Sequence, residues 1–315
     1  MTDIAVIGAG TMGHALALVF ALGGHQVRLT DADPATLARA PALMRGAVDT
    51  LAEAGEVDAE AAGRLAQSVR LCATLAETVR GAAIVIEAIV ERPDIKRTLY
   101  AELDTLMAPD AILASNTSNL DIFPLVPATR QRRTAIAHWY TPPYLCDLVD
   151  VVPGPETDPA VIETLRATVA AMGKVPVVFR RFVQGYVANR LQAAIGLEVQ
   201  HLLDEGLVTP RDIDLSVLHG IALRMPILAV LAKADFTGLE LLRDLMANRS
   251  YTPPEPRAHS ETLDTLIAAG RTGVMAGRGY FDWGGRAPAD LFRERDRKLL
   301  ALKRALRDIG PMEGT

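Results

Sequence analysis

The chain has 315 residues, half of them hydrophobic, so it can bury a substantial core and is long enough for two domains. Its net charge is −5 with acidic and basic residues mixed along the sequence, which argues against a nucleic-acid surface or a basic membrane patch. Two cysteines are too few for a disulfide framework, and no Cys/His cluster offers metal ligands. No signal segment opens the chain, and no uncharged apolar run reaches membrane-spanning length. We therefore expect a cytoplasmic protein that does not associate with a membrane.

The first predicted elements are a buried strand at residues 4–7, a glycine-rich turn and a helix at residues 14–22. The turn reads Gly8-Ala9-Gly10-Thr11-Met12-Gly13, a G-x-G-x-x-G motif. In this context Gly8 permits the turn, Gly10 lets the backbone approach a pyrophosphate, and Gly13 lets the helix pack against the strand. The helix N-terminus supplies N–H groups and a positive dipole end for the phosphates. The motif predicts a dinucleotide site; a simple packing turn is the alternative.

The second predicted strand, residues 25–30, ends at Asp31. A carboxylate at the tip of this strand accepts hydrogen bonds from both ribose hydroxyls and repels a 2′-phosphate, so it favours NAD over NADP. FAD stays open on these residues alone. We expect NAD, because a histidine and a carboxylate later in the chain suit hydride transfer to nicotinamide.

Helices are predicted from residue 33 to residue 67 with a break at Gly55, and then strands at 68–72, 82–88 and 111–114. Glu91 and Lys96 stand at the start of the helix between the last two strands, where they could contact the nicotinamide ribose or form an exposed ion pair. Small polar residues at 115–119 follow the third strand. They predict either a capped turn or a hydrogen-bonding rim for substrate and cofactor.

A histidine and an aspartate lie at the centre of the predicted active site. His138 closes the apolar strand 134–137, and open α/β sheets bind ligands at the carboxyl edge of their strands. Two prolines then force a turn before the strand 148–152, which carries Asp150 between β-branched neighbours. A carboxylate in that position is costly unless it is paired, and a histidine that turns toward it has the fixed orientation of a general base. A satisfied histidine and a surface aspartate are the alternative.

The rest of the chain predicts a second, helical domain. A helix at 158–172 and a strand at 175–179 complete the first domain, so we expect an α/β fold with a Rossmann-type NAD-binding domain at 1–183 and an all-α domain at 184–315. The helix predicted at 184–205 is apolar on both sides and must be buried. A homodimer formed through this domain would bury it, as would a well-filled monomer core.

Taken together, these motifs resemble the L-3-hydroxyacyl-CoA dehydrogenase family. The resemblance covers residues 3 to about 285 and includes the glycine motif, Asp31, the segment Glu91 to Lys96, the segment SNTS, the His-aromatic-aromatic-x-Pro sequence from His138, and the helix start GYVANRL at 185–191. The segments at 142–144, 153–157 and 222–224 are similar to the branch that contains L-gulonate 3-dehydrogenase (lambda-crystallin) and carnitine dehydrogenase.

The resemblance implies a role for each matching residue. It implies His138 as general base with Asp150 as its acidic partner, Ser118 and Asn189 as hydrogen-bond donors to the substrate oxygen, and Asn116 beside the nicotinamide. Glu91 and Lys96 match cofactor contacts of the family. The sequence departs from the family pattern at Asp150, where glutamate is usual, at Thr141, where asparagine is usual, and at Gln184, where proline is usual.

The substrate is predicted less closely than the chemistry. The resemblance implies oxidation of the 3-hydroxyl of an L-3-hydroxyacyl-CoA or of a small L-3-hydroxy acid. Residues 45–70 carry few basic side chains for the phosphates of a coenzyme A thioester. Arg224, between Leu223 and Met225, could instead bind a free carboxylate, as in a gulonate-like or carnitine-like enzyme. Alternatively, Arg224 could have a structural role and form an ion pair with Asp235 or Glu240. An alternative from a different functional class is a non-catalytic, crystallin-like protein that keeps the fold without the chemistry.

Overall fold

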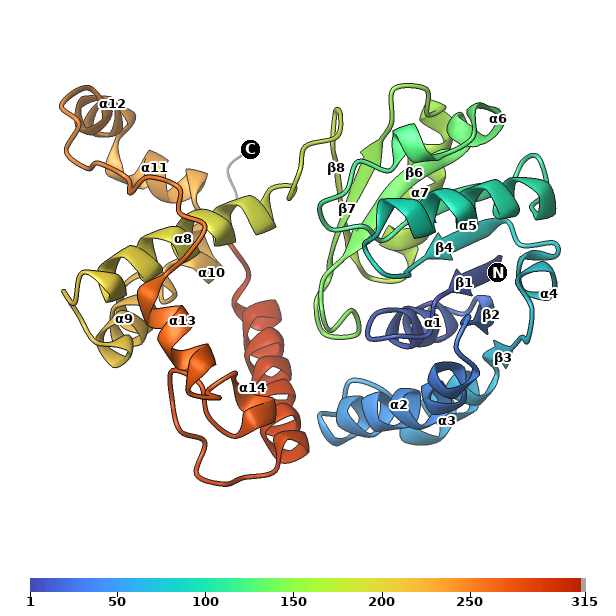
Figure 1. Ribbon diagram of the computed structural model, residues 1–315, viewed down its shortest axis with the longest axis horizontal. Helices are drawn as coiled ribbons and strands as arrows, with labels where there is room; N and C mark the ends of the chain where they lie inside the picture. Colours follow the sequence, from blue (N-terminus) through green and yellow to red (C-terminus); the bar gives the residue numbers. More distant parts are fainter. Residues whose placement is uncertain (313–315) are drawn as a thin grey trace. The chain divides into compact units, whose positions relative to one another are not determined.

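The computed structural model describes residues 1–312, and the chain folds as two compact units, Met1–Val187 and a second that begins at Ala188. The first unit is built on a single sheet of eight strands (Figure 1). The strands are β1 (Asp3–Ile7), β2 (Gln26–Thr30), β3 (Arg70–Leu71), β4 (Ile84–Glu87), β5 (Ile112–Ser115), β6 (Thr134–Trp139), β7 (Leu148–Pro153) and β8 (Val175–Val178).

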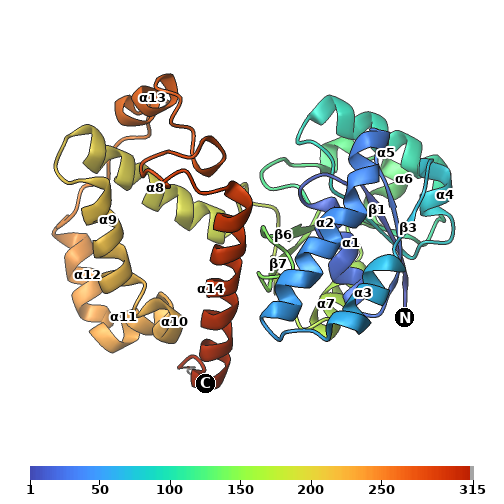
Figure 2. The same ribbon diagram turned by 90° about the horizontal axis from the view of Figure 1, so that it is seen from below.

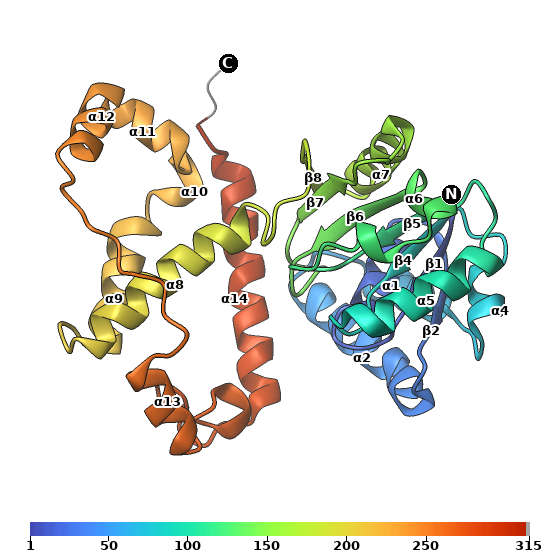
Figure 3. The same ribbon diagram turned by 45° about the horizontal axis from the view of Figure 1, so that its top comes forward.

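The strand order is β3-β2-β1-β4-β5-β6-β7-β8, and every neighbouring pair is parallel except β6 and β7. Figure 3 shows β7 and β8 at one end of this sheet. The predicted α/β architecture, with its strand–turn–helix start, is therefore confirmed. The single antiparallel pair matters for the site, because it brings residues twelve positions apart in the chain directly opposite each other.

Helices pack against both faces of the sheet (Figure 2). One face is covered by α1 (Gly13–Leu22), α2 (Pro34–Glu53), α3 (Ala59–Gln67) and α7 (Pro159–Ala171). The other carries α4 (Leu75–Val79), α5 (Pro93–Leu106) and the 3-10 turn η1 (Phe123–Leu125), and a short helix α6 (Ala128–Gln131) precedes β6. Side chains alternate between the faces along each strand, so Ile4 and Val6 join the first core while Ala5 and Ile7 join the second. By the same alternation His138 faces the side of Ile136.

The end of the first unit differs from the sequence prediction. The helix expected from residue 184 begins instead at Ala188, as α8 (Ala188–Asp204). Gly185 and Tyr186 have φ angles of +77° and +50°, which a right-handed helix does not allow. Tyr186 is fully buried in the second core, which ties residues 184–187 to the first unit.

The second unit is helical. After α8 it contains α9 (Pro210–Ser216), the π-helical turn η2 (Val217–Ile221), α10 (Met225–Leu228), α11 (Leu231–Thr237), α12 (Leu239–Ala247), α13 (Glu261–Ala268), the 3-10 turn η3 (Val274–Ala276) and α14 (Pro288–Ile309). None of the elements from α8 to η3 contains a buried residue. Within residues 1–312 no helix is long and apolar enough to cross a membrane.

Candidate active site

The glycine motif forms a tight turn between β1 and α1. Gly8 has a φ of +96°, and a Cβ there would lie 2.6 Å from the carbonyl oxygen of Ala88. A Cβ on Gly13 would lie 1.6 Å from the carbonyl oxygen of Gly8, so only glycine allows the helix to begin this close to the strand. A Cβ on Gly10 would meet nothing within 4 Å. The two outer glycines are thus required by packing, while the middle one keeps the backbone open to a ligand.

A cavity of about 950 Å³ lies beside this turn. Gly8, Gly10 and Asp31 line it, together with residues of α2, α5 and the ends of β1 and β4. The Asp31 carboxylate accepts hydrogen bonds from the backbone N–H groups of Ala9 (2.6 Å) and Asp33 (2.8 Å), which hold it at the tip of β2. Thr11 and Met12 precede α1 on the same turn. A glycine turn that leaves room for phosphates and an anchored acidic residue for a ribose fit NAD.

His138 and Asp150 lie opposite each other on the antiparallel strands β6 and β7. His138 Nδ1 is 3.1 Å from Asp150 Oδ2, and the two residues are 3 % and 1 % exposed. Because both residues are buried, the carboxylate depends on protein donors rather than on solvent, and His138 is one of them. The pair has the geometry that orients an imidazole through one ring nitrogen and leaves the other for a reactant.

Two tyrosines that sequence reasoning missed pack against His138. The hydroxyl of Tyr140 donates a 2.7 Å hydrogen bond to Asp150 Oδ2, and its ring is edge-on to the imidazole at 4.6 Å between centroids. The Tyr186 ring also lies 4.6 Å from the imidazole, and its hydroxyl donates to the carbonyl oxygen of Thr117 at 2.6 Å. Tyr140 could have been found from its position two residues after His138, because alternate residues of an extended chain point to the same side.

Glu91 holds the polar loop that follows β5. Its Oε1 atom accepts hydrogen bonds from the Thr117 hydroxyl and from the backbone N–H groups of Ser118, Asn119 and Leu120. Burial works against the charged form, but these donors and the nearby Lys96 ammonium outweigh it, so the pKa of Glu91 lies below its ordinary value. Glu91 therefore fixes the loop that carries Ser118.

Lys96 is not part of an exposed ion pair. Its side chain is 1 % exposed, and its ammonium donates to Glu87 Oε1 at 2.6 Å and lies 3.5 Å from Glu91 Oε2. Glu87 also accepts hydrogen bonds from Tyr100 and Ser115, both at 2.6 Å, which satisfies its buried carboxylate. Lys96 thus belongs to a buried polar network under the sheet edge, a network that the sequence pattern did not reveal.

Asn116 joins the ends of two strands. Its side-chain oxygen accepts a 2.9 Å hydrogen bond from the backbone N–H of Trp139, next to His138. Four predicted site residues therefore lie on or next to strands β5, β6 and β7 of the first unit: Asn116, Ser118, His138 and Asp150.

Asn189 and Arg224 belong to the second unit. Asn189 is in the first turn of α8, and Arg224 precedes α10, where its side chain donates to the carbonyl oxygen of Gly220 at 3.0 Å. Among the residues that the structure describes, no ion pair joins Arg224 to Asp235 or Glu240, so the structural pairing considered for it is not found.

Two family models match the chain, one to each part. The model for the NAD-binding domain of 3-hydroxyacyl-CoA dehydrogenase matches residues 3–182, and the model for the C-terminal domain of the same enzyme matches residues 185–283. Together they cover most of the chain, as the sequence motifs had indicated.

Relatives with assigned activities match along almost the full length. The chain is 31 % identical to 5-formyl-3-hydroxy-2-methylpyridine 4-carboxylate 5-dehydrogenase of Mesorhizobium japonicum, over 96 % of this chain and 98 % of that protein. It is 30 % identical to L-carnitine dehydrogenase of Streptomyces coelicolor, over 98 % and 96 %. The crystal structure of the first type of enzyme, described as an NAD⁺-dependent dismutase, superimposes with a TM-score of 0.87 at 30 % identity, covering 98 % of this chain and 99 % of the other. The chain therefore belongs to the 3-hydroxyacyl-CoA dehydrogenase family and is an NAD-dependent dehydrogenase.

Proposed function

We propose that the enzyme oxidises the 3-hydroxyl group of a small L-3-hydroxy acid to a ketone, with His138 as the general base. The observation that carries this proposal is the buried contact between His138 Nδ1 and Asp150 Oδ2. A base must touch the hydroxyl from which the proton leaves, and a histidine is suited to this near neutral pH.

The proposed proton transfer uses the second ring nitrogen. Because Asp150 accepts a hydrogen bond from Nδ1, the Nε2 atom has the lone pair that takes the proton from the substrate hydroxyl. NAD, when bound, would accept the hydride that leaves the carbon bearing this hydroxyl. The imidazolium formed is then stabilised by the Asp150 carboxylate, and in the reverse direction His138 returns the proton to the ketone oxygen.

The remaining site residues are proposed to hold the reactants. Ser118 and Asn189 donate hydrogen bonds to the substrate oxygen, on which negative charge grows in the transition state. Asn116 lies beside the nicotinamide, and Glu91 supports this region by fixing the loop that carries Ser118. For Lys96 we propose an indirect role, since its ammonium is buried against Glu87. Gly8, Gly10, Thr11, Met12, Gly13 and Asp31 form the proposed binding site for the rest of NAD.

Arg224 is proposed to bind the substrate carboxylate. Its guanidinium is exposed and, within residues 1–312, is in no ion pair with a carboxylate. The two relatives named above are a dehydrogenase of a pyridine carboxylate and an L-carnitine dehydrogenase. Their names support a small polar substrate for this enzyme as well.

An L-3-hydroxyacyl-CoA is the second candidate substrate, because the matched family models carry that activity in their names. Its phosphates would need cationic side chains. Residues 45–70 contain three arginines, Arg45, Arg64 and Arg70. Arg64 contacts Glu60 and Arg70 contacts Glu77, so two of the three already have acidic neighbours. This favours the free acid.

We also propose that the enzyme is a homodimer formed through its second unit. The elements α8 to η3 contain no buried residue, although α8, α11 and α12 carry many large apolar side chains. A second copy would cover such surfaces.

The decisive experiment is NADH formation by wild type, His138→Ala and Arg224→Ala with L-3-hydroxybutyryl-CoA, free L-3-hydroxybutyrate, L-gulonate and L-carnitine. Arg243→Ala, which removes another exposed arginine of the second unit, is the control. We expect turnover of a free acid, a fall in kcat of about 10²–10⁴ in His138→Ala, and a rise in KM for Arg224→Ala alone.

Other outcomes separate the alternatives. Turnover of the thioester that is unaffected by Arg224→Ala would exclude the carboxylate role and make this an acyl-CoA enzyme. Turnover that survives in His138→Ala would exclude His138 as the base. No turnover of any of the four compounds by the wild type would contradict the proposed substrate class.

A further inference from the structure

The Asp150 carboxylate binds two side chains through the same oxygen atom. Its Oδ2 accepts one hydrogen bond from the Tyr140 hydroxyl at 2.7 Å and has the His138 Nδ1 contact at 3.1 Å. Asp150 is 1 % exposed and sits in the middle of β7 between Val149 and Val151, so solvent cannot hold the carboxylate in place. The shorter of the two bonds is the one from the phenol.

These two partners lie two positions apart in the sequence. His138 is on β6 and Tyr140 directly follows the last residue of that strand, and their rings meet edge to face at an interplanar angle of 72°. An aspartate side chain is short, and its carboxylate can turn about two bonds only. With the phenol bound, the carboxylate has one orientation that serves both donors. Without it, among the residues that the structure describes, the 3.1 Å contact to the imidazole would be the one remaining side-chain bond to Asp150.

We propose that Tyr140 is a positioning residue: its hydroxyl anchors Asp150 so that the carboxylate holds His138 with Nδ1 protonated and Nε2 directed at the substrate. This inference rests on the proposed role of His138 as base. Tyr140 itself exchanges no proton with the substrate in this scheme.

The phenol stays a donor under all ordinary conditions. Partial burial, the hydrogen bond to Asp150 and the charge of that carboxylate raise the pKa of Tyr140 well above its usual value. Within residues 1–312, the other phenol beside the imidazole, Tyr186, is not hydrogen-bonded to Asp150. Its hydroxyl donates to the carbonyl oxygen of Thr117 instead.

Tyr140→Phe removes only the anchoring oxygen, and Tyr186→Phe is its matched control. Both variants delete one phenol oxygen from a ring whose centroid is 4.6 Å from the imidazole, but only the first breaks a bond to Asp150. We expect kcat of Tyr140→Phe to fall about tenfold to a hundredfold with KM little changed, which is the loss expected for a hydrogen bond to a charged group.

The imidazole tautomer gives a readout that does not depend on turnover. Nitrogen-15 NMR of the neutral histidine, assigned by comparison with His138→Gln, should show a single Nδ1–H tautomer in the wild type and in Tyr186→Phe. Tyr140→Phe should show a mixture of tautomers. A mixture already present in the wild type would overturn the proposal even if Tyr140→Phe fails to fold, and a single tautomer with unchanged kcat in Tyr140→Phe would overturn it too.

A longer carboxylate provides the rescue test. Asp150→Glu reaches one methylene further toward His138, so removal of the phenol should reduce kcat less in the Asp150→Glu background than in the wild type. Equal losses in both backgrounds would show that Tyr140 does not act through the carboxylate. If His138→Ala retains activity while the tautomer still responds to Tyr140→Phe, the proposed reaction fails and the positioning contact stands.

Discussion

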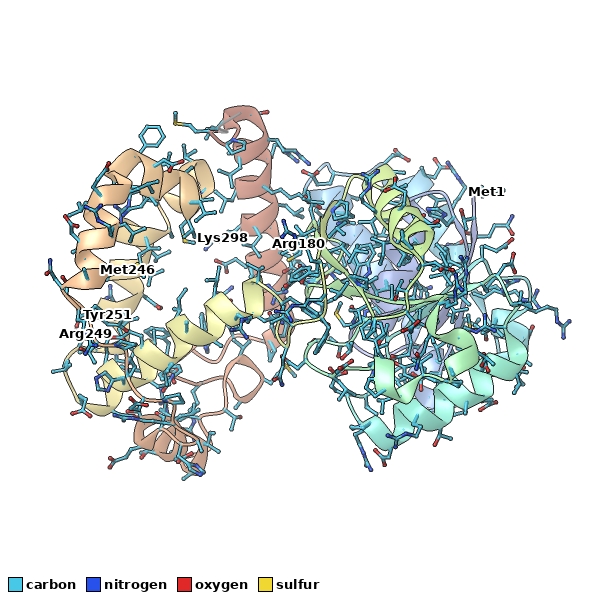
Figure 4. The ribbon with its side chains drawn as sticks, turned by 90° about the horizontal axis from the view of Figure 1, so that it is seen from above. Met1, Arg180, Met246, Arg249, Tyr251 and Lys298 are labelled. Atoms are coloured by element: carbon cyan, nitrogen blue, oxygen red, sulfur yellow. The ribbon has the colours of Figure 1, made fainter. Side chains whose placement is uncertain are left out.

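The two units of this enzyme bury their apolar residues very differently. The first contains two packed cores, one on each face of its sheet, with residues such as Ile4, Leu16 and Tyr100 fully enclosed. In the described part of the second unit, Leu291 and Leu300 on α14 are the only buried hydrophobic residues. Leu231 and Phe236 on α11 are 79 % and 67 % exposed. Met246 on α12, which is labelled in Figure 4, is 73 % exposed.

The proposed homodimer would explain this contrast, because the first unit is complete in one chain and a second copy would complete the second unit. A sheet with helices on both faces satisfies its backbone groups and covers its apolar residues by itself. Helices with apolar residues on several sides gain stability only when something covers them. The chemistry of the His138 pair is accordingly built into the self-sufficient unit, and the second unit is the part that a partner copy is proposed to complete.

The largest effect is expected from Gly13→Ala, which tests how tightly the first unit is packed. The new methyl would lie 1.6 Å from the Gly8 carbonyl oxygen, so the start of α1 must move. We expect a loss of about 3 kcal/mol, equivalent to a fall in Tm of about 6–12 °C, measured by calorimetry. Hydrogen exchange should increase in the first unit and stay unchanged in the second.

Gly10→Ala is the matched variant. Its methyl meets nothing within 4 Å, so the free energy of unfolding without NAD should change little. NAD binding, measured by titration calorimetry, should weaken about tenfold because the methyl takes space that the pyrophosphate needs. Equal destabilisation by the two substitutions would contradict the different packing of the two glycines.

Sequence reasoning succeeded where the signal is local. The glycine turn, Asp31 and the strand that ends near His138 follow from spacing, because each function needs particular residues next to a strand end. Tyr140 was missed although it lies two residues after His138, because nothing in the local sequence marks its hydroxyl as a second donor to Asp150. Lys96 was missed as a buried residue because charge patterns indicate exposure, and Glu87 compensates its charge from another element.

The second unit was harder to predict for a different reason. Between residues 225 and 247 the chain forms three short helices, α10 to α12, and the apolar pattern does not identify an inward face. A periodic pattern marks a core only when that core lies in the same chain. The boundary after Val187 also depends on two residues with positive φ, one of which is a tyrosine rather than a glycine.

A smaller effect is expected from Leu231→Glu, which tests whether a second copy of the chain covers the second unit. A charge on this exposed position of α11 should raise the dimer dissociation constant by about tenfold or more, measured by analytical ultracentrifugation. Leu43→Glu, on the 47 % exposed position of α2, is the control and should leave the mass unchanged. A wild type that stays monomeric at high concentration would show that the second unit is stable with its apolar side chains exposed. The homodimer could then not explain the difference in burial between the two units.

The smallest effect is expected from Glu91→Gln, which tests whether the polar loop shares the stability of the first unit. The folded-state pKa of Glu91 is lowered from 4.5, so its carboxylate contributes stability above that pH and loses the contribution as pH falls through the lowered value. Between pH 7 and pH 4.5 the variant should therefore have a Tm lower than the wild type by about 2 °C or less, since the side chain is 40 % exposed and partly screened by solvent.

Below pH 4.5 the two Tm curves should converge, because protonated Glu91 and glutamine carry the same charge. Glu163→Gln is the control: Arg166 lowers the pKa of this fully exposed glutamate on α7, but no loop depends on it, so its Tm should follow the wild type throughout. The hydrogen bonds found for Glu91 among the described residues are to residues of the first unit, so we expect hydrogen exchange in α8 to α14 not to respond to Glu91→Gln. Curves that stay parallel down to pH 3 would mean that the carboxylate's charge does not hold the loop, and that Ser118 is positioned by Thr117 and Tyr186 instead.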